Sequence, residues 1–332
     1  MSDGIRQITD GALPVLSQAT LGRLEIDYCE VIRVVENAFI ALRTGDSENP
    51  LKTIVQPRDK RSLGYSMVGR DGASKTVGFK VVYEFDPERT KNAYRFHSFI
   101  FLCDDLTGMP IAMLDVVELG PLRTSATSAL MARAAHPCAA NALVVGSGVQ
   151  GQIALPMLVA AIPGLSRLQI FGTHQAGLHV ARENVEKRYP GQTVEFVSDL
   201  EEAARHADIV VGAAGLSSKQ FVRHGWMKPG AVAVLLGYGV DADVFHGADF
   251  RIATDTSQML VTCNDLAGPN GEIPTVDAEL PDILLGRAMA RRSDRDVVFA
   301  YNSGMVVTDV ALGRYLADRA LAQDLGERVK LW

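Results

Sequence analysis

A glycine-rich segment near the middle of the chain limits what this sequence can fold into. Residues Gly146–Gly151 have the spacing G-x-G-x-x-G and directly follow the apolar run Ala142–Val145. In such a loop the first glycine permits a tight turn, the second lets the backbone approach a pyrophosphate, and the third lets the next helix pack on a sheet. The helix N-terminus then presents N–H groups to the phosphates. The segment therefore predicts dinucleotide binding, with a purely structural glycine turn as the alternative.

From residue 141 onward, short apolar runs alternate with helical segments. Helices are expected over 174–189 and 200–207, the second opened by a capping box of Ser198 and Glu201. This alternation indicates right-handed crossovers and a parallel sheet with helices on both faces. The expected strands are 142–145, 167–171, 193–197, 208–211, 231–236 and 250–254.

The first third of the chain has a different pattern, typical of an α+β segment. Apolar residues at helical spacing predict a helix over 27–43, with Asp27 as its N-cap. A further helix is expected over 123–133, and a final one over 310–325 that Asp309 caps or anchors. Runs rich in Val, Ile and Phe predict strands that pair as a meander, over 76–85, 96–102 and 111–119.

Composition and charge exclude several classes of protein. The 332 residues contain 33 Lys and Arg against 39 Asp and Glu, a net charge of −6 without basic blocks, which argues against nucleic-acid binding. No run of about 18 apolar residues predicts a membrane span, and the N-terminus has no secretory pattern. The four cysteines form no C-x-x-C and have no histidines at ligand spacing, so no metal site is expected. We therefore expect a cytoplasmic protein whose partner is a small molecule.

The sequence leaves the choice between NAD and NADP open. NAD-binding folds commonly place an acid at the end of the second strand, where it holds the ribose 2′-OH. Here that strand runs into Gly172, Thr173 and His174, and no carboxylate follows. Thr173 and His174 can donate to a 2′-phosphate, but no adjacent Arg makes the case for NADP positive.

Four motifs together show a resemblance to a known family, the ornithine cyclodeaminase/mu-crystallin family. They are Gly78-Phe79-Lys80-Val81-Val82, the run Pro121–Ala129 containing Arg123-Thr124-Ser125-Ala126, the Gly146–Gly151 loop, and Asn302-Ser303-Gly304 with Asp309. The resemblance implies an α/β fold in which a Rossmann dinucleotide-binding domain, residues 126–307, is inserted into another domain. That other domain, residues 1–125 plus 308–332, is an α+β substrate-binding and dimerisation domain, which implies a homodimer.

The resemblance also implies roles for individual residues. Lys80 and Arg123 are the expected catalytic residues, because a substrate carboxylate needs a cation and Arg offers a bidentate grip. Burial of Lys80 in an apolar stretch would favour proton donation. The expected substrate-binding residues are Lys52, Lys80, Arg95, His97, Arg123 and Ser303. The expected cofactor-binding residues are Arg95, Thr124, Gly146, Gly148, Val149, Gln150, Gly151, Thr173, His174, Ala213, Ala214, Leu236, Gly237 and Asn302.

This sequence departs from the family pattern at several positions. The Asp that assists deamination in cyclodeaminases is missing after the strand at 231–236, where only Asp241 or Asp243 offers a substitute. Arg95 and His97 replace small or neutral residues, and with Lys52, Lys80 and Arg123 they would form a cationic pocket for a dicarboxylic substrate. Alternatively, Arg95 lies on the cofactor side and neutralises the pyrophosphate.

Three functions follow from these observations. The first is an NAD(P)H-dependent reductase of an α-imino acid, or the reverse amino-acid dehydrogenase, with the cofactor supplying the redox chemistry. The second is an NAD⁺-dependent ornithine cyclodeaminase that releases ammonia. The third is a crystallin-like protein that binds a nucleotide or effector without turnover.

Overall fold

The computed structural model of the chain describes residues 11–85 and 96–331, and its residues group into two compact units. The terminal unit comprises Met1–Ile26, Asn37–Gly120 and Met305–Trp332, and the central unit comprises Asp27–Glu36 and Pro121–Gly304. The divisions follow Gly120 and Gly304, whereas the sequence suggested residues 125 and 307. Residues 27–36 group with the central unit, which the sequence did not indicate.

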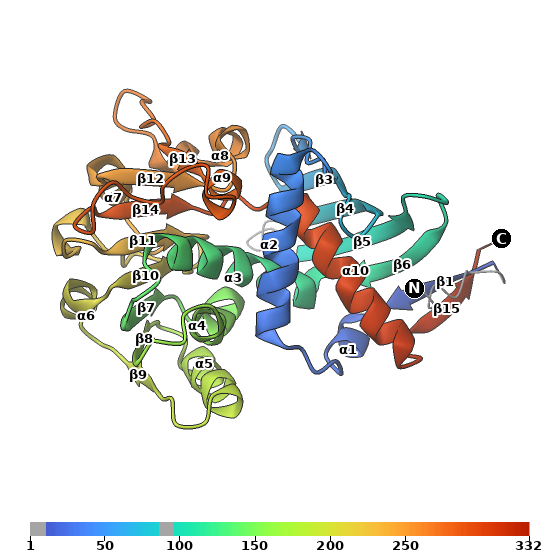
Figure 1. The fold of residues 1–332 in the computed structure, drawn as a ribbon, viewed down its shortest axis with the longest axis horizontal. Helices are drawn as coiled ribbons and strands as arrows, with labels where there is room; N and C mark the ends of the chain where they lie inside the picture. Colours follow the sequence, from blue (N-terminus) through green and yellow to red (C-terminus); the bar gives the residue numbers. More distant parts are fainter. Residues whose placement is uncertain (1–10, 86–95, 332) are drawn as a thin grey trace. The chain divides into compact units, whose positions relative to one another are not determined.

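The terminal unit is built on a seven-stranded sheet in the order β15-β1-β6-β5-β4-β3-β2. Its central strands β4, β5 and β6 pair antiparallel in sequence order, which confirms the expected meander. Helix α10 (Val306–Ala322) packs on strands β3 to β6 of this sheet (Figure 1). The strands are β1 (Ala12–Leu16), β2 (Thr53–Val55), β3 (Ser62–Asp71), β4 (Thr76–Phe85), β5 (Phe96–Asp104), β6 (Pro110–Asp115) and β15 (Glu327–Lys330).

Two helices begin at local capping hydrogen bonds. Helix α2 (Tyr28–Thr44) begins where Asp27 Oδ1 accepts a hydrogen bond from the Cys29 backbone N–H at 2.9 Å, as expected. The predicted strand over 111–119 is wrong in its second half, because β6 ends at Asp115 and helix α3 (Val116–Ala135) begins there. The Asp115 carboxylate accepts from the Val117 N–H at 2.7 Å, and this cap starts the helix within an apolar run that reads as strand. The short helix α1 (Gln18–Leu21) follows β1.

The central unit contains an eight-stranded sheet in the order β13-β12-β14-β11-β10-β7-β8-β9, and every pair in it is parallel. This confirms the expected parallel sheet. Strand β14, between β11 and β12, was not predicted from the sequence. The strands are β7 (Asn141–Val145), β8 (Arg167–Phe171), β9 (Val194–Phe196), β10 (Ile209–Gly212), β11 (Val232–Leu235), β12 (Phe250–Ala253), β13 (Ala278–Glu279) and β14 (Val298–Tyr301).

Helices connect these strands and shield the sheet. The expected helices over 174–189 and 200–207 are present as α5 and α6, but Asp199 rather than Ser198 caps the second, accepting from the Glu202 N–H at 3.0 Å. The final helix begins at Val306, one turn before the predicted start. The connecting helices are α4 (Val149–Ala161), α5 (Gln175–Arg188), α6 (Leu200–His206), η1 (His224–Trp226), α7 (Ala242–Gly247), α8 (Thr256–Thr262), η2 (Asn264–Leu266) and α9 (Leu280–Leu284).

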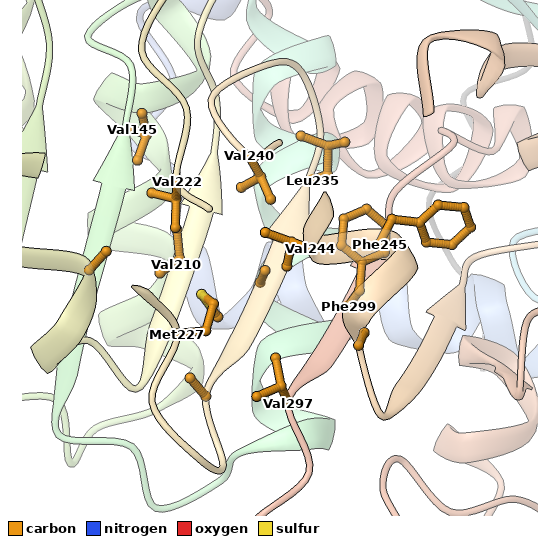
Figure 2. Packing of buried hydrophobic residues seen from close by; sticks show 14 of the residues in the cluster. Val145, Val210, Val222, Met227, Leu235, Val240, Val244, Phe245, Val297 and Phe299 are labelled. Carbon is orange, nitrogen blue, oxygen red and sulfur yellow. The ribbon is translucent and has the colours of Figure 1, made fainter. Parts of the chain in front are cut away.

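One hydrophobic cluster fills the space between a face of this sheet and the helices α6, α7 and α8 (Figure 2). Phe245 from α7 and Phe299 from β14 are fully buried, with ring centroids 4.9 Å apart. Burying an aromatic side chain of this size contributes on the order of 2–3 kcal/mol. The cluster therefore fixes the strands whose carboxyl ends form the candidate site. Among the described residues, none of the helices has both the length and the apolar character to cross a membrane.

Candidate functional site

The glycine loop between β7 and α4 has the geometry that the sequence motif requires. Gly146 has a φ of +125°, and a Cβ atom there would lie 2.5 Å from the backbone of Ala213, so the loop lies directly against the end of β10. A Cβ atom on Gly151 would lie 1.9 Å from the Gly146 carbonyl oxygen. Neither position can hold a side chain without moving the backbone, which explains why both are glycine.

Gly148 differs from these two glycines, because a Cβ atom there would meet nothing within 4 Å. Its backbone faces open space at the N-cap of α4, where no side chain caps the helix. Next to it, the Gln150 carboxamide Oε1 is buried and has no hydrogen-bond partner among the described residues. An uncapped helix N-terminus with open space before it fits a pyrophosphate. The residues present therefore fit a dinucleotide cofactor.

The other expected cofactor contacts converge at the carboxyl ends of neighbouring strands. The backbone N–H groups of Leu236 and Gly237 both donate to the Gly212 carbonyl at 3.1 Å. A Cβ atom on Gly237 would lie 2.9 Å from the Ala214 carbonyl oxygen. Strands β8 and β9 lie on one side of β7, and β10, β11 and β14 lie on the other, so the sheet has its topological switch point between β7 and β10. Ligands bind at this point in open α/β sheets.

A cavity of about 470 Å³ adjoins this edge of the sheet. Its lining includes Leu236 and Gly237 after β11 and Tyr301 at the end of β14. The Tyr238 hydroxyl donates to Asp265 Oδ2 at 3.0 Å, and the Tyr301 hydroxyl donates to Thr262 Oγ1 at 3.2 Å. Burial raises the pKa of Tyr301. The cavity lies beside β11 and β14, on the β10 side of the topological switch point.

At the end of β8, Thr173 and His174 are exposed. The His174 backbone N–H donates to Ser147 Oγ at 3.2 Å, which joins the glycine loop to this strand end. Among the described residues, no hydrogen bond or ion pair brings a carboxylate to either side chain. The structure thus leaves both NAD and NADP open, as the sequence does.

The Asn302-Ser303-Gly304 segment follows β14 and lies against the Arg123 segment of α3. The Asn302 amide Nδ2 donates to the Thr124 carbonyl and to Ser128 Oγ, both at 3.0 Å, and its Oδ1 accepts from the Gly304 N–H. These bonds show that the Asn302 side chain ties the β14 loop to α3. They account for both amide hydrogens of Asn302, which the resemblance gave as a cofactor-binding residue.

Gly304 provides the space that the Arg123 guanidinium occupies. A Cβ atom on Gly304 would lie 2.9 Å from Arg123 Nη1. Ser303 lies between Asn302 and Gly304, and its backbone N–H donates to Thr254 Oγ1 at 3.1 Å. The structure therefore brings Arg123, Thr124, Asn302 and Ser303 together within the central unit, whereas the sequence placed Arg123 and Thr124 in the substrate-binding domain.

In the terminal unit, Lys80 lies on β4 and forms a buried ion pair. Its Nζ atom is 2.8 Å from Asp309 Oδ1 in the first turn of α10, and the two side chains are 5% and 2% exposed. Of the two expected roles of Asp309, capping is wrong, because the α10 N-cap is Met305 and it makes no side-chain capping bond, whereas the ion pair with Lys80 anchors the helix on the sheet. A carboxylate at this distance favours the ammonium form of Lys80, which opposes the effect of burial.

Lys52 and Tyr65 share the sheet face of Lys80. Tyr65 pairs with Val82, two residues from Lys80, so the alternation of strand side chains puts Tyr65 on the same face. The Lys52 Nζ atom lies 5.8 Å from the centroid of the Tyr65 ring. Burial, followed by the charge of Glu84, raises the pKa of Tyr65. Tyr65 was not singled out from the sequence, because the strand that carries it, β3, was not predicted either.

His97 does not join this group. It pairs with Tyr83 on β4, an odd number of residues from Lys80, so it points to the opposite face of the sheet. Arg95 lies outside the described residues. The cationic pocket suggested from the sequence therefore loses His97 on the Lys80 face.

Neither substitute for the missing cyclodeaminase aspartate is a free acid at the edge of the sheet. Asp241 Oδ1 accepts from the Asp243 N–H at 3.0 Å and so caps α7. Asp243 Oδ1 accepts from the His224 N–H, also at 3.0 Å. Both carboxylates thus make local structural bonds. Within residues 11–85 and 96–331, His, Cys, Asp and Glu side chains form no group suited to a metal ion.

Known proteins resemble this chain over nearly its full length. The nodulation efficiency protein NfeD of Rhizobium meliloti is 24% identical over 313 residues, which cover 94% of this chain and 96% of that protein. The structure of Thermococcus litoralis Δ(1)-pyrroline-2-carboxylate reductase in complex with NADH and L-proline aligns with a TM-score of 0.81 and 21% identity, covering 96% of this chain and 100% of the other. An archaeal alanine dehydrogenase dimer with bound NAD aligns with a TM-score of 0.79 and 20% identity, covering 97% and 100%.

These likenesses establish the fold, and a family-wide sequence pattern establishes the relationship. The pattern described as the ornithine cyclodeaminase/mu-crystallin family matches residues 15–324. The match includes the Lys80 strand, the Arg123 segment, the glycine loop and the Asn302–Gly304 turn. The chain therefore belongs to the ornithine cyclodeaminase/mu-crystallin family.

Proposed function

We propose that this protein is an NAD(P)H-dependent reductase of an α-imino acid. The observation that carries the proposal is the Arg123 guanidinium, which lies against Gly304 in the same unit as the dinucleotide loop. A guanidinium at the nicotinamide half of a dinucleotide site suits a substrate that carries a carboxylate. The pyrroline-2-carboxylate reductase of the same fold, solved with NADH and L-proline, supports this assignment.

In this proposal, Gly148 and the α4 N-terminus hold the pyrophosphate, and the residues after β10 and β11 hold the nicotinamide end. The bound cofactor supplies the hydride. Arg123 binds the carboxylate in the plane of its guanidinium, which orients the C=N bond. Lys80 and Lys52, in the terminal unit, stay the further substrate-binding cations that the family resemblance predicts. The reaction adds one hydride to the carbon of the protonated imine, C=NHR⁺, and gives the amine CH–NHR, so one NAD(P)H is consumed for each amine formed.

The structure offers less support for a cyclodeaminase. That activity uses an aspartate after β11 in the family, and the two nearby aspartates here cap or brace α7. A protein that binds nucleotides without turnover is the other alternative. The buried ion pair of Lys80 and Asp309 favours catalysis over simple binding, because buried charges are costly to keep.

One set of assays separates these functions. The protein is incubated with NADH or NADPH and either Δ(1)-pyrroline-2-carboxylate or pyruvate plus methylamine, and absorbance is followed at 340 nm. A reductase oxidises the cofactor in proportion to the amine formed. Ammonia release from ornithine with NAD⁺ and no net absorbance change identifies a cyclodeaminase, and nucleotide binding without either reaction identifies a binding protein.

A variant and a substrate comparison then test the site. Arg123→Ala leaves a substrate carboxylate unpaired, so we expect kcat/KM to fall by about 100-fold, or about 3 kcal/mol, while Arg123→Lys retains part of the activity. Wild-type kcat/KM in Arg123→Ala contradicts the assignment. An imine made from oxaloacetate tests the dicarboxylic substrate. Faster turnover of that imine than of the pyruvate imine supports a second carboxylate site.

We also propose that the protein assembles as a homodimer through the open face of the terminal sheet. Phe79 and Phe99 on this face are 46% and 47% exposed, and Val68 and Tyr83 are exposed beside them. The opposite face packs against α10. A contiguous apolar sheet face of this kind is typical of an interface. The related fold of an alanine dehydrogenase dimer supports a second copy as its occupant.

Light scattering coupled to size-exclusion chromatography tests the dimer. Phe79→Glu places a charge at the centre of the proposed interface, so we expect it to convert dimer to monomer. Val180→Glu, on an exposed helix position of the central unit, is the control and should not change the mass. A wild-type monomer at micromolar concentration excludes the proposal.

A further inference from the structure

Asp309 occupies a position that its sequence context does not explain. Its carboxylate is buried in the first turn of α10, 229 residues away in sequence from the Lys80 ammonium that it contacts. Its Oδ1 atom lies 2.8 Å from Lys80 Nζ on strand β4. A carboxylate buried to this extent is retained at a cost in free energy.

Glycines on two strands bring Asp309 within reach of Lys80. A Cβ atom on Gly78 would lie 2.4 Å from Val310 Cγ2, and one on Gly69 would lie 2.9 Å from Val306 Cγ1. Any side chain at these positions would lift the first turn of α10 off the sheet. The absence of Cβ atoms therefore sets the helix at the distance that a 2.8 Å ion pair requires.

The start of α10 is also held by a side chain from outside the helix. Asn49 Oδ1 accepts a hydrogen bond from the Val307 N–H at 2.9 Å. In the same turn, Thr308 Oγ1 donates to the Met305 carbonyl at 2.6 Å. A carboxylate in the first turn is favoured by the positive end of the helix dipole. Asp309 is thus a fixed anion, and the ammonium it contacts is fixed in turn.

We propose that Asp309 is the positioning residue for Lys80, holding its Nζ atom in one place and in the ammonium form for the imino-acid substrate. The proposal rests on the proposed reductase function. In this role Lys80 orients the substrate by donating a hydrogen bond to it. Lys80 stays charged and therefore does not act as a neutral base. Asp309 acts only through Lys80 and touches no reacting atom.

Two variants of Asp309 and a neighbour in the same helical turn test the proposal. Asp309→Asn keeps the shape but removes the charge, and Asp309→Glu keeps the charge on a longer stem. Thr308→Val is the matched control, because Thr308 is fully buried beside Asp309 and its hydroxyl, among the residues that the structure describes, bonds only to the Met305 carbonyl of the same turn. All three are measured for kcat and KM with the imine, and for NADH affinity by fluorescence.

We expect Asp309→Asn to lose about 100-fold in kcat/KM, the size of loss that small misplacements of a reacting group produce. The kcat/KM of Asp309→Glu should be at least about ten-fold higher than that of Asp309→Asn, and NADH affinity should stay unchanged in both variants. Thr308→Val should lose stability but keep its kinetic constants. Equal kinetic losses in Asp309→Asn and Thr308→Val, or unchanged kinetics in Asp309→Asn, overturn the proposal.

A chemical readout separates this proposal from the reductase assignment. Acetic anhydride modifies amines and spares ammonium groups, and mass spectrometry of peptides gives the rate at Lys80 relative to the exposed Lys75. At pH 9 we expect Lys80 in Asp309→Asn to react at least about five-fold faster than in the wild type, with Thr308→Val unchanged. An unchanged rate in Asp309→Asn overturns the role of Asp309, whatever the wild-type enzyme reduces. If the rate rises but no imine is reduced, only the reductase function fails.

Discussion

The Arg123 guanidinium lies where a side chain on Gly304 would otherwise be. Gly304 has a φ of +70°, and a Cβ atom there would be 2.9 Å from Arg123 Nη1. The glycine thus serves the turn after β14 and leaves room for the cation that we assign to the substrate carboxylate. A substitution at Gly304 is therefore expected to have two effects, one on the backbone of the turn and one on the place of the Arg123 guanidinium.

Gly304→Ala should lower both stability and activity. The positive φ costs an alanine about 1 kcal/mol, and the new methyl group displaces the Arg123 guanidinium, so we expect kcat/KM to fall by at least about ten-fold. Gly286→Ala is the matched control, because Gly286 has a φ of +69° and nothing within 4 Å of its Cβ position. The two variants should lose similar stability in urea unfolding. Equal activity in both would show that Gly304 does not position Arg123.

Gly148→Ala should separate cofactor binding from folding. A methyl group at this position meets no protein atom within 4 Å, so the melting temperature should stay within about 1 °C of the wild type. The same methyl group occupies the space that we assign to the pyrophosphate. We expect the Kd for NADH, measured by fluorescence titration, to rise by at least about 100-fold. Gly225→Ala, also with open space at its Cβ position, should bind NADH normally. Wild-type affinity in Gly148→Ala would place the pyrophosphate elsewhere.

The Lys80–Asp309 pair should show strong coupling in a double-mutant cycle. Removing one partner leaves a buried charge unmatched, so Lys80→Met and Asp309→Leu should each lower the free energy of unfolding by about 3 kcal/mol or more. The double variant should lose far less than the sum. The exposed pair Glu201–Arg205 on α6 provides the comparison, with a coupling of about 0.5 kcal/mol or less. Additive losses at Lys80 and Asp309 would mean that the two charges do not depend on each other.

Asp208 should make the central unit sensitive to acid. Burial raises the pKa of this carboxyl, but hydrogen bonds from Lys228 and from the Ala140 and Asn141 N–H groups outweigh burial and leave the pKa below its usual value. A lowered pKa in the folded state means that the stabilisation is present above about pH 4 and is lost as the pH falls through the folded-state value. Asp208→Asn should therefore be less stable at pH 7 and show a weaker loss of stability below pH 4. Parallel stability curves for the variant and the wild type would contradict this.

Cofactor choice should respond to a charge at the end of β8. Thr173→Asp supplies a carboxylate for the ribose 2′-OH of NADH and repels a 2′-phosphate, so the ratio of NADH to NADPH affinity should rise by at least about ten-fold. His179→Asp places the same charge further along α5 and should leave the ratio unchanged. The measurement is a fluorescence titration with each cofactor. An unchanged ratio in Thr173→Asp would mean that the ribose does not lie at this strand end.

Local sequence signals predicted much of the fold because they act over short distances. The apolar run before Gly146 and the spacing of the glycines specify a strand, a turn and a helix without reference to the rest of the chain. The same holds for β4 and β8, whose observed bounds equal the predicted ones. The prediction failed at residues 116–119, where the cap made by Asp115 overrides an apolar run that reads as strand.

Long-range pairing lay beyond the sequence. Alternation along one strand predicts which of its own residues share a face of the sheet. Which residues of β5 share a face with Lys80 on β4 depends on the register between the two strands. That register puts His97 opposite Tyr83 and so away from Lys80. Asp309 likewise had the sequence of a helix cap, and only the close approach of α10 to Gly78 turned it into the partner of Lys80.

The sequence alone determined the family and the dinucleotide fold, because both depend on residue types at fixed short spacings, and the resemblance to the family predicted the two cations Lys80 and Arg123. The tertiary structure decided what surrounds those cations. The contact of Asp309 with Lys80, the space that Gly304 leaves for Arg123 and the sheet face on which His97 lies each depend on segments far apart in the chain. Such contacts depend on how the elements pack, and the local sequence does not encode that packing residue by residue.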